Sequence, residues 1–382
     1  MQIAKKHFQL HIDKAKSVAF LKKNAVLIVA ITAALVTSLI VPPDKAYLDY
    51  FDWKTLTCLF CVLATVCAFK NIRFFSVLAA KIVALFKNTR ACVLALTYIT
   101  FLGSMLIAND MALLTFLPLG YFVLSSTGKE KYMAFTFIMQ NIAANLGGML
   151  TPFGNPQNLY LYTKFNIPTS EFIATMLPPF LISITLITLS CLMFVKKETL
   201  AIEREQVTLP KWRTIVYALL FTLSIVIVFR VIPFEIGLVV ITLSLLILDR
   251  KALKDVDYGL LLTFVAFFIF SGNMSRIEGV RALLSGLLEK NTLVVSSLSC
   301  QVISNVPSAI LLSQFTGNYT ELLLGVNIGG VGTLISSLAS LITFREYTAH
   351  NPKGVKKYLL LFSAFNFGFL FLLLGIQSFI LL

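Results

Sequence analysis

The feature that most constrains this chain is a series of apolar runs, each about 20 residues long, that recur along its whole length. A helix needs about 20 apolar residues to cross the hydrocarbon core of a bilayer. Of the 382 residues, 58% are hydrophobic and only 13% are charged, against about 25% charged residues in soluble domains. A β-barrel would show short alternating segments instead. We therefore predict an all-α polytopic membrane protein.

The apolar runs divide the chain into two similar halves. We expect a basic cytoplasmic segment at 1–23, a first transmembrane repeat at 24–195, a cytoplasmic linker at 196–212, a connecting transmembrane helix at 213–230 and a second transmembrane repeat at 231–382. In the first half we predict helices at 24–42, 54–69 and 168–195, an amphipathic stretch at 71–89, a hairpin at 91–127 and a broken helix at 131–163. Their counterparts in the second half are helices at 234–249, 256–274 and 356–381, an amphipathic stretch at 276–290, a hairpin at 292–317 and a broken helix at 320–344.

Both hairpins are predicted to enter the membrane and return on the same side. The apolar arms 292–303 and 306–316 flank Ser304-Asn305, and at 1.5 Å per residue each arm reaches only about 17 Å. The longer arms within 91–127 flank Asn109-Asp110, and nothing polar beside this pair forms an aqueous loop. Re-entrant backbone is tolerated at that depth only where protein or water satisfies its polar groups.

The two broken helices are predicted from their glycines and prolines. As one helix, segment 131–163 would span about 50 Å, which is longer than a bilayer requires. It contains Gly147, Gly148, Pro152, Gly154 and Pro156, so it should unwind in the middle. Segment 320–344 contains Gly325, Gly329, Gly330 and Gly332. The alternative is that these glycines only allow close helix packing.

The net charge of +14 could suggest a nucleic-acid partner, but its distribution argues for a topological signal instead. With a cytoplasmic N-terminus and hairpins that do not cross, 25 of the 32 Lys and Arg residues fall inside, as the positive-inside rule requires. The seven outside are Lys45, Lys54, Lys164, Arg230, Arg276, Arg281 and Lys290. We therefore expect the lipid bilayer as a partner and no nucleic acid. Nine crossings then place the C-terminus outside a multi-pass inner or plasma-membrane protein.

Three segments recur in the same order in both halves. Phe51-Asp52-Trp53 matches Val256-Asp257-Tyr258, and Asn109 matches Asn305. The run from Ala144 to Thr151 matches the run from Val326 to Thr333 without a gap. Because a single extra helix lies between the halves, corresponding segments run through the membrane in opposite directions. Such an inverted repeat is the usual plan of a secondary transporter.

The repeat predicts a site where two hairpin tips and two unwound helices converge. Half-helix N-termini carry partial positive charge that suits an anion, and freed carbonyls with Asn oxygens suit Na⁺. The candidates are Ser104, Asn109, Asp110, Thr151, Gly154 and Asn155 in the first half and Ser304, Asn305, Thr333 and Ser336 in the second. The alternative for isolated polar residues such as Thr151 or Ser336 is interhelical hydrogen bonding.

Asp110 is the only acidic residue in either predicted hairpin or unwound loop. A carboxylate inside a membrane is a functional candidate by default. The alternative is that Asp110 caps the N-terminus of the second hairpin arm. We read Asp52 and Asp257 as structural, because acids at helix starts favour the helix dipole.

No sequence feature points to an enzyme or to a bound cofactor. Cys58 and Cys61 form a C-x-x-C, but no second Cys pair or nearby His completes a metal site. His7, His11 and His350 all lie in predicted cytoplasmic segments, and the motifs of metalloproteases and serine hydrolases are missing. Discontinuous helices in inverted pairs favour alternating access over a channel. We expect a carrier, with Na⁺ or H⁺ as its coupling ion.

At these residues the chain resembles the ion transporter superfamily, which includes citrate-transporter-like permeases, divalent anion:sodium symporters and arsenite efflux permeases. The resemblance covers roughly residues 24–381. Its specific part is carried by Ala108-Asn109-Asp110-Met111-Ala112 with Pro118, by the run from Gly147 to Asn158, by Ser304-Asn305-Val306-Pro307 and by the run from Gly325 to Ile335. It implies a homodimer in which a transport domain moves like an elevator against a scaffold domain.

The resemblance also implies a substrate class and ligands. In the dicarboxylate symporters, a Ser-Asn-Thr at each tip binds sodium and the substrate carboxylate, whereas this chain has Ala-Asn-Asp at 108–110 and Ser-Asn-Val at 304–306. By that match, Ser104, Asn109 and the Gly154 carbonyl would bind one cation. A second cation would depend on Asn305, since Cys300 replaces an expected hydroxyl. The implied activity is Na⁺- or H⁺-coupled transport of a di- or tricarboxylate or an inorganic oxyanion; the alternative is efflux of arsenite or antimonite.

Overall fold

The computed structural model describes residues 25–200 and 208–381. Within these ranges the chain forms helices and no β-strand, and one isolated bridge joins Asn88 to Thr199. The predicted all-α polytopic class is confirmed. The predicted basic segment 1–23 and part of the predicted linker 196–212 lie outside the described residues.

The helices follow the predicted segments closely. In the first half they are α2 (Ala25–Ile40), α3 (Trp53–Asn71), α4 (Phe74–Val83), α5 (Thr89–Ile107), α6 (Asn109–Ser126), α7 (Met133–Gly147), α8 (Pro156–Lys164) and α9 (Thr169–Phe194). Next come α10 (Lys211–Val228), α11 (Phe234–Leu248), α12 (Arg250–Lys254), α13 (Tyr258–Ser275) and α14 (Glu278–Lys290). The chain ends with α15 (Thr292–Ile303), α16 (Asn305–Leu312), α17 (Tyr319–Ile328), α18 (Leu338–His350) and α19 (Val355–Leu381).

Two of these helices begin at the aspartates that recur in the sequence. The Asp52 carboxylate accepts a hydrogen bond from the Thr55 N–H (2.9 Å) at the start of α3. The Asp257 carboxylate accepts from the Leu260 N–H (2.9 Å) at the start of α13. Each carboxylate therefore satisfies an N–H group that has no partner within its helix.

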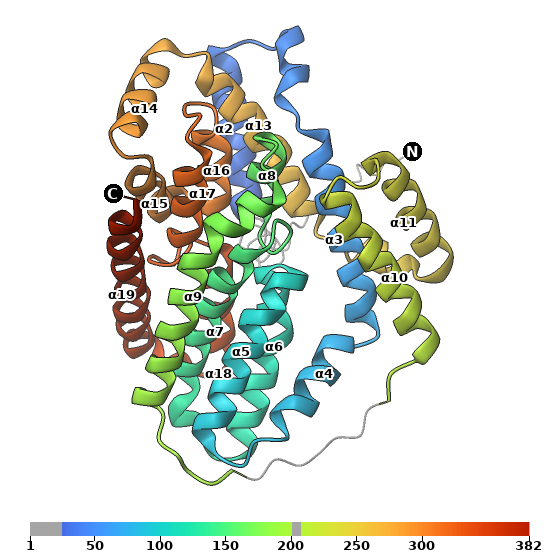
Figure 1. Ribbon diagram of the computed structural model, residues 1–382, viewed down its shortest axis with the longest axis vertical. Coiled ribbons are helices and arrows are strands. Elements are labelled where there is room, and N and C mark those ends of the chain that lie inside the picture. The colour runs from blue at the N-terminus through green and yellow to red at the C-terminus, as the bar shows by residue number, and fades with distance from the viewer. Residues whose placement is uncertain (1–24, 201–207, 382) are drawn as a thin grey trace, which may run out of the picture.

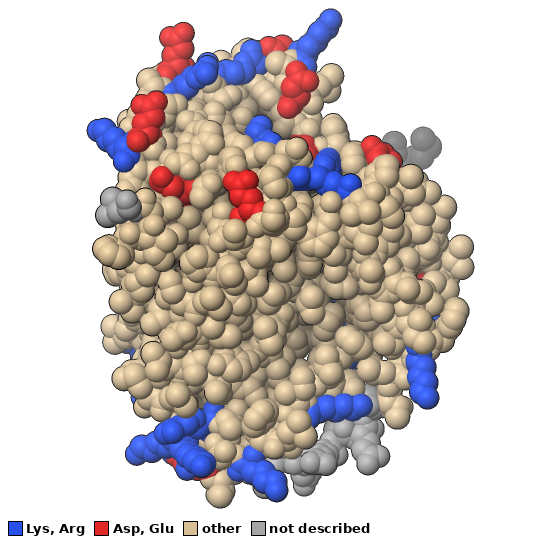
Figure 2. Space-filling model, in the orientation of Figure 1, with Lys and Arg blue, Asp and Glu red and all other residues tan. Residues whose placement is uncertain are grey.

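The surface has the charge distribution of a membrane protein. Figure 2 shows Lys, Arg, Asp and Glu gathered at the two ends of the long axis, with a broad band almost free of them between. By length and composition, α3, α5, α9, α10 and α19 could each cross a membrane. A sixth span results if the segments Arg250–Ser275 and Glu278–Lys290, which meet at 96°, count as one. These lengths neither establish nor exclude the nine predicted crossings, which stay a prediction together with the orientation of the termini.

The two hairpins differ in length more than expected. In the second, α15 and α16 have 12 and 8 residues, so each is too short to cross. In the first, α5 and α6 have 19 and 18 residues, and α5 could span about 28 Å. Length therefore does not prevent α5 from crossing. Helices α5 and α6 run side by side from one end of the molecule and turn near its middle (Figure 1), and the re-entry of this hairpin from one side of the membrane stays a prediction.

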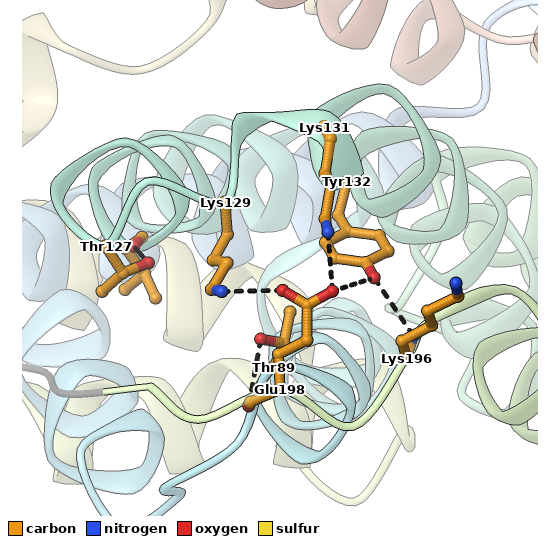
Figure 3. Close-up of polar contacts among 8 residues, drawn as sticks. Thr89, Thr127, Lys129, Lys131, Tyr132, Lys196 and Glu198 are labelled. Atoms are coloured by element: carbon orange, nitrogen blue, oxygen red, sulfur yellow. Dashed lines mark hydrogen bonds and ion pairs between the residues drawn. The ribbon is translucent and has the colours of Figure 1, made fainter.

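A strap formed by residues 195–200 holds the base of the first hairpin (Figure 3). The Glu198 carboxylate binds Lys129 Nζ (2.7 Å), Lys131 Nζ (2.6 Å) and the Tyr132 hydroxyl (2.9 Å). The Thr89 N–H donates to the Glu198 carbonyl (2.8 Å). Hydrogen bonds from these two lysines and the tyrosine lower the pKa of Glu198 to about 2. The strap thereby ties the end of α9 to the start of α5 and to the segment that joins α6 to α7.

Candidate functional site

The two hairpin tips have the same backbone geometry. Ala108 and Ser304 adopt positive φ angles of 63° and 76°, which are uncommon for residues with a side chain. The residue after each turn is an asparagine that begins the second arm. Asn109 Oδ1 accepts from the Asp110 N–H, and Asn305 Oδ1 accepts from the Val306 N–H, both at 2.9 Å. The two asparagines matched in the sequence therefore occupy matching positions in the structure.

Each hairpin is followed by an interrupted helix. Between α7 and α8, residues 148–155 leave the α-helix, and Pro156 begins α8, where proline is well tolerated. Between α17 and α18, residues 329–337 do the same, and Ser337 caps α18 by accepting from the Ala339 N–H. The predicted broken helices 131–163 and 320–344 are thus interrupted at their glycines, and the second continues to His350 instead of ending at 344.

Both interrupted helices are fixed to the first arm of their own hairpin by matching contacts. A methyl group on Gly147 would lie 2.1 Å from the Phe101 carbonyl oxygen, and one on Gly329 would lie 2.8 Å from the Ser297 carbonyl oxygen. The Thr151 hydroxyl donates to the Met105 carbonyl (2.7 Å). The Thr333 hydroxyl donates to the Gln301 carbonyl (3.0 Å). In this structure both predicted threonines therefore bind backbone.

The second tip is hydrogen-bonded directly to its loop. The Ser336 carbonyl accepts from the Asn305 N–H (2.9 Å) and the Ser304 hydroxyl (3.3 Å). The Ser336 hydroxyl donates to the carbonyls of Gly330 (2.9 Å) and Thr333 (2.8 Å). The structure therefore brings the four second-half candidates together. Ser304, Asn305 and Ser336 are hydrogen-bonded to one another, and the Thr333 carbonyl joins them through the Ser336 hydroxyl.

The first tip leaves its loop more open. Among the described residues, no hydrogen bond joins Asn109 or Asp110 to Thr151, Gly154 or Asn155. The loop closes on itself: a methyl group on Gly148 would lie 2.4 Å from Asn155 Oδ1 and 2.9 Å from the Gly154 carbonyl oxygen. Asn155 Oδ1 is buried without a hydrogen-bond partner. Two oxygen-bearing groups of the loop thus crowd together, and one of them lacks a donor.

Ser104 lies beside this loop without bonding to it. Its hydroxyl donates to the Phe101 carbonyl (2.8 Å) and lies 2.8 Å from the position of a methyl group on Gly147. The serine is fully buried on α5. Ser104 can therefore offer only its oxygen lone pairs to a ligand.

A network of buried amide side chains connects the two halves. Asn109 Nδ2 donates to Asn145 Oδ1 (3.3 Å), and the Asn145 carbonyl accepts from Asn155 Nδ2 (3.2 Å). Asn155 Nδ2 also donates to Asn327 Oδ1 (3.3 Å), and Asn327 Nδ2 donates to Asn158 Oδ1 (2.6 Å). The chain of contacts runs from the first tip through both interrupted helices.

Sequence reasoning missed several members of this network. Asn145 and Asn327 could have been found, because they occupy the same position of the repeat. Asn158 lies within the motif that carries the resemblance. Asn141, which donates to Asn366 Oδ1 (3.3 Å), has no such signal. Gln157, which donates to Asn327 Oδ1 (3.4 Å), lies within the same motif as Asn158.

The two tips come close to the same point. A methyl group on Gly330 would lie 3.3 Å from Asn305 Nδ2 and 3.6 Å from Asn145 Oδ1, and Asn145 in turn accepts from Asn109. The N-termini of α6, α8, α16 and α18 therefore all begin around one amide cluster. Four N-termini concentrate partial positive charge there.

Asp110 lies in the first turn of α6, at the edge of this cluster. Its Oδ1 atom is buried and has no hydrogen-bond partner. The Asp110 carboxylate does not cap α6, because this helix has no side-chain cap. The Asp110 N–H donates to the Asn109 side-chain oxygen. An intramembrane carboxylate with an unpaired oxygen is costly unless a ligand or proton compensates it. The geometry disfavours capping as the role of Asp110.

Within the described ranges, no three His, Cys, Asp or Glu side chains gather as a metal site. The six cysteines, including Cys58 and Cys61, are free and buried. The oxygens at the amide cluster come instead from amides, carbonyls, hydroxyls and one carboxylate, which are hard ligands that suit Na⁺ better than a transition metal.

Comparison with known proteins agrees with this architecture. Residues 17–319 match the family described as Citrate transporter (CitMHS). The chain is 36% identical over 295 residues to the uncharacterized transporter MJ0456 of Methanocaldococcus jannaschii. The aligned region covers 77% of this chain and 81% of that protein. It is 30% identical over 307 residues to the inner membrane protein YbiR of Escherichia coli K12, with coverage of 79% and 82%. The chain is therefore a membrane transporter that belongs to the citrate transporter family.

Proposed function

We propose that this protein is a secondary active transporter of a small anion, a di- or tricarboxylate or an inorganic oxyanion, coupled to Na⁺ or H⁺. The observation that carries the proposal is the amide cluster at the hairpin tips. Four helix N-termini meet there, and two buried oxygens, Asp110 Oδ1 and Asn155 Oδ1, have no hydrogen-bond partner. N–H groups and helix dipoles favour an anion, whereas unpaired oxygens favour a cation or a proton.

Placing both kinds of group at one site supplies a coupling mechanism. An ionised Asp110 repels an anionic substrate, so a cation or proton that neutralises it favours substrate binding. By thermodynamic linkage, the bound anion then favours the cation or proton to the same extent. The coupling ion and the substrate therefore bind together, as a symporter requires.

The matching contacts in both halves support an inverted repeat. The glycine approaches at Gly147 and Gly329 and the threonine hydrogen bonds at Thr151 and Thr333 occur at corresponding positions. Each hairpin and its interrupted helix thereby form one packed unit. We propose that both units move together past α3, α10 and α11, which pack on one another, in a homodimeric elevator transporter of the cell membrane.

The test is uptake into proteoliposomes that contain the purified protein. Radiolabelled citrate, succinate, sulfate, phosphate, arsenite and antimonite are each offered under an inward Na⁺ gradient, an inward H⁺ gradient or no gradient. We expect accumulation of one of these anions above equilibrium with one of the two gradients. Transport of arsenite or antimonite alone would favour the efflux-permease alternative. Movement of none of these species under any gradient would refute the proposed function.

A further inference from the structure

Arg230 joins parts of the molecule that the proposed elevator would move apart. It follows α10 in the chain, and its backbone is left-handed, with φ of 64°. Across from it, Asn166 also has a positive φ, 49°. Each is the left-handed residue that closes its own helix: the Ile167 N–H donates to the Tyr162 carbonyl and the Val231 N–H donates to the Val226 carbonyl, both at 3.2 Å. The C-terminal ends of α8 and α10 therefore meet at this junction.

The Arg230 guanidinium is held entirely by neutral groups. Nη1 donates to the Ile167 carbonyl (3.2 Å), Nη2 donates to the Tyr162 carbonyl, and the group lies 4.1 Å above the centre of the Tyr162 ring. Its Nε atom is buried without a hydrogen-bond partner. Among the described residues, no carboxylate pairs with Arg230. The cation is therefore bound by carbonyls and an aromatic face alone.

These contacts reach the candidate site through α8. The Tyr162 and Ile167 carbonyls lie at the C-terminal end of α8, where a cation complements the helix dipole. The opposite end of α8 begins at Asn155, whose amide belongs to the cluster. The neighbouring residue Phe229 packs edge-on against Phe153 in the unwound loop, with ring centres 6.0 Å apart. Phe229 and Arg230 thus contact the loop that precedes α8 and the end of α8, respectively.

We propose that Arg230 is a latch that fastens α8 to the end of α10 in this conformation and releases it during transport. The inference rests on the proposed function, since only a moving transport unit requires the release. Neutral carbonyls suit such a latch, because water can replace them when the guanidinium leaves. A buried ion pair would leave an uncompensated charge behind.

The test is hydrogen–deuterium exchange of the backbone of residues 160–168 in the purified protein, in detergent, with and without citrate and NaCl. Arg230→Gln should exchange about fivefold faster here, as expected for the loss of an ordinary net hydrogen bond. Arg230→Lys should be intermediate, because an ammonium lacks the two-pronged geometry. Arg276→Gln is the matched control. Arg276 forms an ion pair with Asp44 (2.7 Å) and has no part in the Arg230 contact, so exchange of residues 160–168 should be unchanged in this variant.

A latch differs from a static helix cap in its response to substrate. In the wild type, citrate with NaCl, or the anion and coupling ion found in the uptake screen, should accelerate exchange in 160–168. In Arg230→Gln the exchange should already be fast and insensitive to substrate. Unchanged exchange in Arg230→Gln, or no substrate effect in a wild type that transports, would overturn the latch alone. A wild type that transports no anion would overturn the proposed function and the latch with it.

Discussion

Gly147→Ala tests the contact on which the first half of the site is built. A methyl group at this position would lie 2.1 Å from the Phe101 carbonyl oxygen, and side-chain carbons are essentially never found closer than 3.0 Å to another heavy atom. Helices α5 and α7 would therefore have to separate by about 0.9 Å, the difference between those two distances. Overpacking of this kind costs about 1–3 kcal/mol. The obstacle is backbone and cannot rotate away.

The matched control is Gly375→Ala in α19, where a methyl group would meet no atom within 4 Å. Alanine favours a helix by about 1 kcal/mol over glycine, and because Gly147 also lies in a helix, α7, this gain applies to both variants. The two should therefore differ by the overpacking cost, about 1–3 kcal/mol. The assay is thermal unfolding in detergent with a thiol-reactive dye, because all six cysteines are buried and free until the protein unfolds. A Gly147→Ala protein with the midpoint and transport rate of the control would refute the reasoning.

Three further outcomes follow from the same geometry. Asn109→Ala and Asn305→Ala should each abolish most uptake in proteoliposomes while insertion is kept, since each leaves buried partners unpaired at about 1–3 kcal/mol. Cysteines at Lys129 and Asn318 should be labelled from opposite faces of the membrane, Lys129 from inside. Because the pKa of Glu198 is lowered to about 2, its ionised carboxylate stabilises the strap fully above pH about 4.5, and this stabilisation is lost as the pH falls towards about 2. Hydrogen exchange in 195–200 should therefore speed up over this pH range in the wild type, and Glu198→Gln should remove that effect.

Hydrophobic length located the helices well but not all of their ends. The helix predicted at 168–195 is α9, from Thr169 to Phe194. The second hairpin was expected to reach 317, yet α16 stops at Leu312. The short helix α12 was missed because it depends on one local contact, the Asp249 carboxylate accepting from the Ala252 N–H (3.1 Å). Such a cap adds nothing to a hydropathy pattern.

The candidate site was predictable only where the chain repeats itself. Asn109 and Asn305 were found because equivalent positions carry the same residue and the same turn. The hydrogen bond between Asn141 and Asn366 joins α7 to α19 and has no counterpart in the sequence. The sequence also left open whether Asp110 caps α6. Asparagine and aspartate stand side by side there, and only the three-dimensional arrangement shows that neither side chain caps α6 and that the Asn109 oxygen accepts from the Asp110 N–H.

The most direct test of the proposed coupling is the ion dependence of anion binding in Asp110→Asn. This change keeps the size of the side chain and removes its charge. Binding of the transported anion to the purified variant is titrated by calorimetry across Na⁺ concentrations at fixed pH, and across pH without Na⁺. We predict that the variant still binds the anion and that its dependence on Na⁺ or on pH is weakened or lost. Binding with the same Na⁺ and pH dependence as the wild type would contradict a coupling role for Asp110.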